Sequence, residues 1–247
     1  MRLIVTADDA GLSEAVDRGI AGAARAGTVT QTTFMVAAAF PDIASAAARI
    51  GGMNIPCGVH LQLTTGAPVS AALRDVVGER LPDHAGALRL DPELVRAEWR
   101  AQIEAAREAG LAPSHLDTHQ GVHRLAAFRH VYFALARDFD LPVRGHDAAF
   151  AAEARAGGVA ATRHVLTGWT GRRLGRAELL SELETYGGSG GILELVTHPG
   201  RVDARLEEMS AWRGRREAEL AVLSDPDLRE TLRARGIVLG DYGTLAT

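Results

Sequence analysis

Side chains that can bind a metal or move a proton gather where apolar runs of the sequence end. They are the carboxylates of Asp8 and Asp9 and the imidazoles of His60, His119 and His198. A strand that enters a core gives a carboxylate no water, so each acid there needs a partner. One carboxylate with two histidines from different strands forms a divalent-metal site that leaves positions open for water and substrate. The sequence therefore predicts a divalent-metal centre.

The two adjacent aspartates are expected to play different parts. Side chains alternate along a strand, so Asp8 and Asp9 should point in different directions. A plainer alternative is that one of them only caps the helix that starts near Ser13.

The fourth predicted strand, residues 115–119, carries three polar groups on one face. Because strand side chains alternate, His115, Asp117 and His119 point the same way. If that face looks inward, Asp117 can orient an imidazole that binds the metal. His123 lies four residues beyond His119, so one helical turn would bring the two rings together. A part for His123 in the site therefore stays open.

The composition of the 247-residue chain excludes several other mechanisms. All 27 basic residues are arginine, so there is no lysine for a Schiff base, a P-loop or a pyridoxal phosphate anchor. The single cysteine, Cys57, excludes an internal disulfide and a thiolate metal cluster. With 31 acidic residues the formal net charge is -4, which argues against nucleic acid as a partner.

Alternating strand and helix patterns place these residues in a fold. Apolar or β-rich runs predict strands at 3–7, 29–36, 55–63, 115–119, 141–144, 191–197 and 237–239. Helical patterns with caps and stops lie at 13–26, 41–50, 91–109, 125–139, 176–186, 206–223 and 226–235. Such alternation predicts an α/β domain with a parallel sheet, open or closed into a barrel, and an active site at the carboxyl ends of the strands.

The stretches between and before these elements suggest further expectations. We expect 66–90 and 146–175 to be lids or binding loops, and the charged cluster 213–217 to be a solvated helix face. The first apolar run is too short for a signal peptide, and no later run approaches the length of a membrane span. The expected protein is a single cytoplasmic domain over residues 1–247 with no membrane span. A homodimer stays open.

Four short motifs, spread over most of the chain, carry a family resemblance. They are TADDAG at 6–11, GVHLQLT at 58–64, PSHLDTH at 113–119 and ELVTHPG at 194–200. Together and in this order they resemble the motifs of the YdjC-like carbohydrate deacetylases, which are relatives of the polysaccharide deacetylases. The resemblance implies an incomplete or distorted (β/α) barrel.

The resemblance also implies a part for each candidate residue. Asp9, His60 and His119 would hold a divalent ion, Mg²⁺ as usually described in the family or Zn²⁺ as in its polysaccharide-deacetylase relatives. The ion would polarise the acetamide carbonyl and stabilise the tetrahedral oxyanion. Asp8 would be the general base, and His198 would protonate the departing amine. The parts of Asp8 and Asp9 could be exchanged, because the sequence shows only that they face differently.

The chain departs from the family pattern at three positions. Ala10 stands where the family usually has phenylalanine, and Gln120 and Gly121 stand where it usually has histidines. Hydrogen in place of an imidazole at Gly121 and a methyl group in place of a phenyl ring at Ala10 remove two ring volumes, which predicts a wider, less aromatic pocket near the metal. The predicted substrate is therefore bulkier than a free disaccharide, for example an amino sugar with an apolar aglycone.

The implied reaction is removal of an N-acetyl group from an amino sugar or glycoconjugate, and two alternatives compete with it. In the first, the same metal and barrel cleave another bond, a phosphoester or a cyclic amide; such enzymes typically open with a His-x-His strand, which this chain lacks. The second is a sugar-binding barrel without catalysis. The presence of Asp8, Asp9 and His198 argues against it.

Overall fold

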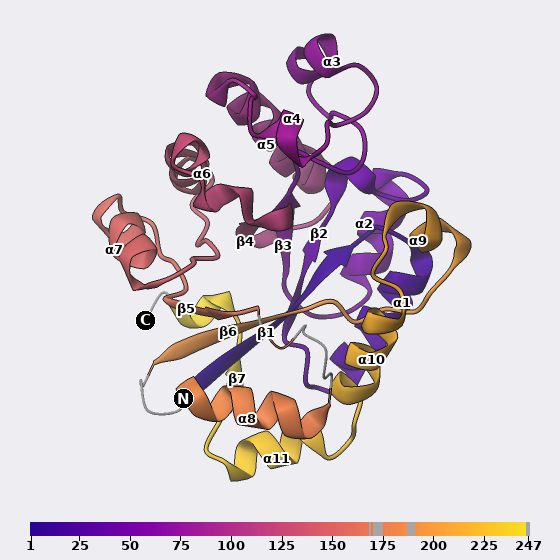
Figure 1. Cartoon of the computed structure of the whole chain (residues 1–247), viewed down its shortest axis with the longest axis vertical. Coiled ribbons are helices and arrows are strands. Elements are labelled where there is room, and N and C mark those ends of the chain that lie inside the picture. The colour runs from indigo at the N-terminus through magenta and orange to yellow at the C-terminus, as the bar shows by residue number, and fades with distance from the viewer. Residues whose placement is uncertain (168, 170–174, 187–190, 246–247) are drawn as a thin grey trace.

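The centre of the molecule is a sheet of seven parallel strands (Figure 1). The computed structural model describes residues 1–167, 169, 175–186 and 191–245. The strands are β1 (Arg2–Ala10), β2 (Gln31–Phe34), β3 (Cys57–Leu61), β4 (Pro113–Thr118), β5 (His164–Leu166), β6 (Ile192–Thr197) and β7 (Val238–Gly240). Their order in the sheet is β4-β3-β2-β1-β6-β5, and β7 pairs with the first residues of β1. β1 is thus the central strand, and eight of its nine residues, from Leu3 onward, are buried.

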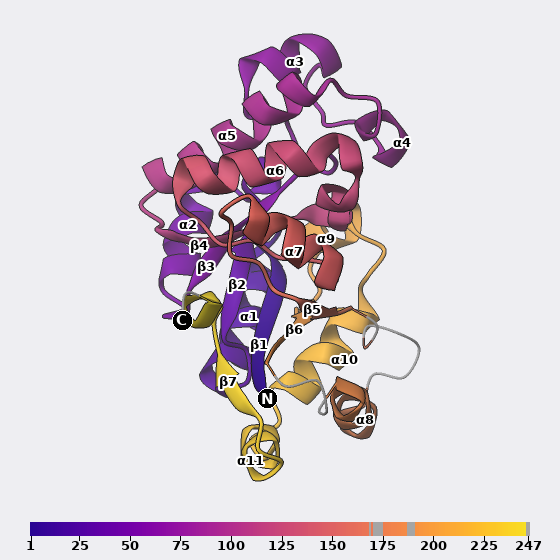
Figure 2. The same ribbon diagram turned by 90° about the vertical axis from the view of Figure 1, so that its left-hand side faces the viewer.

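Helices surround this sheet on its outer side, as the two perpendicular views show (Figures 1 and 2). The α-helices are α1 (Glu14–Arg25), α2 (Ile43–Gly51), α3 (Ala71–Val77), α4 (His84–Ala87), α5 (Pro92–Glu108), α6 (Ala126–Phe139), α7 (Ala148–Ala156), α8 (Arg176–Tyr186), α9 (Ala204–Met209), α10 (Gly214–Leu223) and α11 (Leu228–Ala234). Short 3-10 turns are η1 (Val36–Ala38), η2 (His119–Arg124) and η4 (Tyr242–Leu245).

Local signals explain where the main helices begin and end. The Ser13 hydroxyl accepts a hydrogen bond from the backbone N–H of Val16 and caps α1. Asp91 caps α5 in the same way, ahead of Pro92 at the first helical position. Gly27 follows α1 with φ +80°, a backbone conformation that glycine adopts without strain. The predicted positions of both helices are therefore confirmed.

The barrel is incomplete on one side. The strand predicted at 141–144 is reduced to a single bridging residue, Val143, which pairs with Leu116 of β4 and with Ala161. Through these two isolated bridges, Val143 joins β4 to Ala161, which lies shortly before β5 in the sequence. The architecture is a parallel half-barrel surrounded by helices, as the sequence predicts.

Three other expectations are wrong in detail. The stretch 66–90 contains α3 and α4, and 146–175 contains α7 and β5, so neither is a plain loop. The helix predicted at 206–223 is divided into α9 and α10 by residues 210–213. The chain turns at this break and brings the start of α10 toward the carboxyl end of β1, which matters for the site below. None of the helices in the described ranges is long and apolar enough to cross a membrane.

Candidate metal centre and active site

Strand register brings the candidate residues to one end of the barrel. His60 of β3 lies opposite Asp117 of β4, and Ala7 of β1 lies opposite Thr197 of β6. The carboxyl ends of these four strands surround a cavity of about 520 Å³. All five residues predicted from the sequence line it, namely Asp8, Asp9, His60, His119 and His198.

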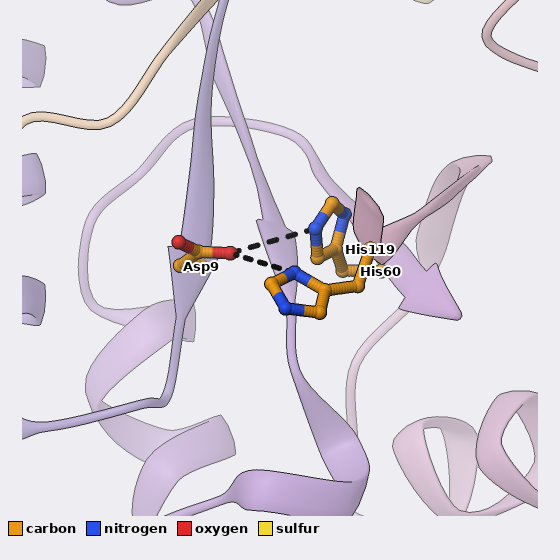
Figure 3. Close-up of side chains that lie close together, drawn as sticks. All are labelled: Asp9, His60 and His119. Atoms are coloured by element: carbon orange, nitrogen blue, oxygen red, sulfur yellow. Dashed lines mark ion pairs between the residues drawn. The ribbon is translucent and has the colours of Figure 1, made fainter. Parts of the chain in front are cut away.

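Asp9 stands at an irregularity of β1 that turns its carboxylate toward two imidazoles (Figure 3). Its φ is +70°, where the pairing register with β2 shifts between Ala7 and Ala10. Asp9 Oδ1 lies 3.5 Å from His60 Nε2 and 3.6 Å from His119 Nδ1. The bulge therefore replaces strict alternation, and Asp8 Oδ2 also comes within 4.0 Å of His60 Nε2. Both acids approach the same histidine, which strand alternation alone did not predict.

The Asp9, His60 and His119 side chains fit a metal ion. Their ligand atoms all lie within 4.8 Å of one another. Asp9 Oδ1 is buried and has no hydrogen-bond partner in the described part of the chain. The distances to the two ring nitrogens are longer than hydrogen bonds, and an unpartnered buried carboxylate oxygen is costly. A cation between these three atoms would remove that cost.

An arginine holds the other oxygen of Asp9. Arg216 Nη2 of α10 donates to Asp9 Oδ2 at 2.5 Å, and both side chains are nearly inaccessible to solvent. Burial alone would raise the pKa of Asp9, but Arg216 and His119 hold it well below its usual value. The carboxylate is thus ionised and presents one free oxygen to the two imidazoles.

The second nitrogen of His60 is also fixed. His60 Nδ1 lies 2.8 Å from Asp117 Oδ1, a contact that leaves Nε2 facing Asp9. A carboxylate in this place orients an imidazole that binds a metal and increases its basicity. Burial would lower the pKa of His60, but Asp117 and Asp8 outweigh it and raise the pKa to about 9.

Asp117 therefore orients a histidine of the neighbouring strand and not one of its own. His115, predicted on the same face as Asp117, is enclosed and stacks on Tyr242 with ring centroids 4.0 Å apart. His119 begins η2, directly after β4.

Asp8 is held in place by a second buried arginine. Arg144 follows the bridging residue Val143, and its Nη1 and Nη2 donate to the two oxygens of Asp8 at 2.8 and 2.7 Å. The same guanidinium reaches Asp117 Oδ2 at 2.7 Å. Asp8, His60 and Asp117 form another close group of possible ligands. Because their carboxylate oxygens already contact Arg144 or His60, this group suits a metal less well than Asp9, His60 and His119.

His123 does not join the cluster. Gln120 and Gly121 have φ of +57° and +65°, so the chain after His119 does not make the helical turn that would align the two rings. The His123 ring instead lies 2.5 Å from Thr118 Oγ1 through Nδ1 and 3.3 Å from the Gly145 carbonyl through Nε2. Burial lowers its pKa to about 3, so it is a neutral structural residue at the cavity wall.

His198 stands across the cavity after β6. Its backbone N–H donates to Glu219 Oε2 at 2.5 Å, and its ring meets the Trp212 ring edge-on at 5.0 Å. His198 Nδ1 is buried without a hydrogen-bond partner among the described residues. Burial lowers the pKa of His198 to about 4, although Asp9 and Asp8 act in the opposite direction. The imidazole is thus neutral near pH 7 in the free protein.

Several residues of the site were not identified from the sequence. Arg216 was expected on a solvated helix face, but it is only 2% exposed and is bound to Asp9. The expectation failed because the break between α9 and α10 turns this face inward. Arg144 and Glu219 gave no local signal, since their partners lie far away in the sequence.

The predicted enlargement of the pocket is only partly supported by the positions of its residues. Gln120 and Gly121 line the cavity as expected. Ala10, however, is fully enclosed in the core and does not line it. Trp212, which lies between α9 and α10, lines the cavity while remaining 41% exposed. The cavity therefore has an aromatic wall that the sequence did not predict.

These features define a class: a parallel (β/α) half-barrel with a carboxylate and two histidines clustered at the carboxyl ends of its strands. A solved peptidoglycan N-acetylglucosamine deacetylase shares this fold, with a TM-score of 0.56 and 12% identity over 99% of this chain and 87% of that chain.

Within this class the chain belongs to the YdjC-like protein family, whose sequence pattern matches residues 2–234. It is 32% identical over 257 residues to a protein of Vibrio cholerae serotype O1 named carbohydrate deacetylase, covering 99% of this chain and 96% of that protein. A solved structure from Enterococcus faecalis V583, named as a candidate cellobiose-phosphate cleavage protein, superposes with a TM-score of 0.86. That protein is 29% identical, and the match covers 99% of this chain and 98% of the other.

Proposed function

We propose that this protein is a metal-dependent hydrolase that removes an N-acetyl group from an amino sugar or glycoconjugate, with residues 1–247 acting as one domain. The observation that carries the proposal is the unpartnered Asp9 Oδ1 between His60 and His119, with Asp8 and His198 lining the same cavity. Relatives across the full length named carbohydrate deacetylase support the reaction and the class of substrate.

Asp9, His60 and His119 would hold the ion. When bound, a divalent ion supplies Lewis-acid polarisation of the acyl carbonyl and makes water more acidic. Two imidazole nitrogens are donors that suit zinc and similar transition ions, whereas magnesium prefers oxygen. The donor set therefore favours Zn²⁺ over the Mg²⁺ that the family resemblance implies, and metal analysis of the purified protein distinguishes them.

Side chains of the protein carry out the two proton transfers of the reaction. Asp8, kept in one orientation by Arg144, accepts the proton of the attacking water. His198 gives a proton to the departing nitrogen, because an amide nitrogen leaves poorly without one. Since the imidazole is neutral in the free protein, the proton that Asp8 takes from the water must pass to His198 before the nitrogen departs, which leaves both side chains as they began.

The first prediction concerns His198. Substitution His198→Ala should lower turnover of an N-acetyl substrate by about 10²- to 10⁴-fold. The loss should be smaller for a trifluoroacetylated amine, whose leaving group needs less protonation. Acetate and trifluoroacetate release measured side by side tests this. Equal losses on both substrates would make His198 a structural or binding residue.

The second prediction concerns Trp212. A sugar ring presents an apolar face that stacks well on indole, so Trp212→Ala should raise KM about tenfold while kcat changes little. Trp212→Phe keeps an aromatic surface and should recover most of the affinity. A fall in kcat with KM unchanged would show that Trp212 acts on His198, which its ring touches, and not on the substrate.

Acetate and free-amine release from a set of N-acetylated sugars is the experiment that tests the function. The set includes N-acetylglucosamine, a chitobiose-type disaccharide and an N-acetylglucosaminyl conjugate, each assayed before and after chelation. Phosphate release from sugar phosphates would favour the phosphoesterase alternative. Sugar binding without turnover of any substrate, by protein loaded with metal, would favour a binding barrel.

A further inference from the structure

Glu194 lies inside the barrel, one layer below the candidate active site. It is fully enclosed in the middle of β6, and four hydrogen bonds reach its carboxylate. Oε1 accepts from Thr6 Oγ1 at 2.8 Å and from Arg144 Nε at 2.9 Å. Oε2 accepts from Thr162 Oγ1 at 3.1 Å and from Tyr242 Oη at 2.7 Å. This acid does not line the cavity, so its interactions act on the site only through its partners.

Tyr242 comes from the C-terminal turn η4 and is held rigidly. It is 1% exposed, its ring stacks on His115 of β4 with planes 7° apart, and its backbone N–H donates to Gln31 Oε1 at 3.3 Å. Burial and the neighbouring Glu194 raise the pKa of Tyr242, so the phenol stays protonated and donates a hydrogen bond to Glu194.

Arg144 connects this layer to the site. Its Nε donates to Glu194, while Nη1 and Nη2 donate to the two oxygens of Asp8. One planar guanidinium thus binds Glu194 and Asp8 at once, with Asp117 Oδ2 also 2.7 Å from Nη1, so a displacement of Glu194 would change how the guanidinium meets Asp8. Hydrogen bonds in such a buried chain polarise one another because little water screens them.

We propose that Tyr242 is a positioning residue which, through Glu194 and Arg144, keeps the Asp8 carboxylate oriented for its part in the reaction. The inference rests on the proposed function for the part of Asp8. The C-terminal turn then has a catalytic consequence although it lies outside the cavity.

Two substitutions test this positioning through kcat. Tyr242→Phe removes the phenol that fixes Glu194 Oε2, so Glu194 and the guanidinium bound to it are held less firmly. We expect kcat to fall about threefold with KM little changed, because Asp8 spends less time in its productive orientation. Glu194→Gln changes the group that Arg144 Nε binds, and it should lower kcat in the same way.

Tyr132→Phe is the matched control. Its hydroxyl is equally buried, but it donates to the backbone carbonyls of Leu116 and Arg144 and not to Glu194. We expect a loss of stability with kcat and KM close to those of the wild type. An unchanged kcat in Tyr242→Phe, or the same fall in Tyr132→Phe, would overturn the proposal.

A second measurement does not depend on turnover. The ¹⁵N–¹H signal of Arg144 Nε, assigned by its loss in Arg144→Met, reports the bond to Glu194 directly. It should change in chemical shift and exchange faster with water in Tyr242→Phe but not in Tyr132→Phe. If the wild type releases no acetate from any substrate, the proposed function fails, and this signal alone decides whether Tyr242 acts on Arg144. An unchanged signal contradicts the linkage.

Discussion

Replacement of His60 by alanine is expected to deplete the protein of metal and to abolish hydrolysis together. The same paired loss is expected for Asp9→Ala and His119→Ala, because each removes one of three ligand atoms that lie within 4.8 Å of one another. Metal content measured by mass spectrometry on purified protein, set beside acetate release, tests the site. Full occupancy in His60→Ala would contradict it.

Asp8→Asn distinguishes the two aspartates. The amide keeps the shape of the side chain but cannot accept the proton of water, so activity should fall about 10²- to 10⁴-fold while the metal is retained. If Asp8→Asn loses the metal and Asp9→Asn keeps it, the parts of the two acids are exchanged. His146→Ala is a control for metal content, since His146 lines the same cavity but belongs to no metal-binding group in the described residues.

The second large effect is expected on stability. Arg144→Met should lower the free energy of unfolding by about 3–5 kcal/mol near pH 8, because it leaves buried carboxylates without their cation. The affected acids are Asp8, Asp117 and Glu194, all of which contact the guanidinium at 2.7–2.9 Å. Urea denaturation measures this loss. Arg100→Met, which removes an exposed arginine paired with Asp138, should cost far less.

The loss caused by Arg144→Met should also depend on pH. Burial alone would raise the pKa of Asp117, but Arg144 and His60 hold it well below its usual value. In the wild type this contribution is present above the unfolded pKa of about 3.9 and disappears as the pH falls through the folded pKa. Without Arg144 the buried acids take up protons more readily. The difference in stability between variant and wild type should therefore shrink from pH 8 to pH 5, and an equal difference at both values would contradict the charge argument.

The sequence by itself predicted the order of the elements and the residues nearest the proposed chemistry. Apolar runs that end in Asp8, His60, His119 and His198 predicted a cluster at one end of a parallel sheet, and the structure brings these side chains to one cavity. This succeeds because parallel strands all present their carboxyl ends at the same edge. Residues at those ends must therefore meet, whatever the helices between them do.

Only the tertiary structure decided which acids approach His60 and which arginine binds each acid. A bulge at Asp9, with its positive φ, turns both acids toward His60, and strand alternation does not reveal such a bulge. Arg144 reaches Asp8 across 136 positions of sequence, and Arg216 reaches Asp9 across 207. No local pattern marks such pairs, because a buried arginine and a solvated one look alike in sequence. Arg144 is buried because the predicted strand 141–144 is reduced to the bridging residue Val143, and Arg216 is buried because the predicted helix 206–223 is divided into α9 and α10. The packing of the whole chain determines both features.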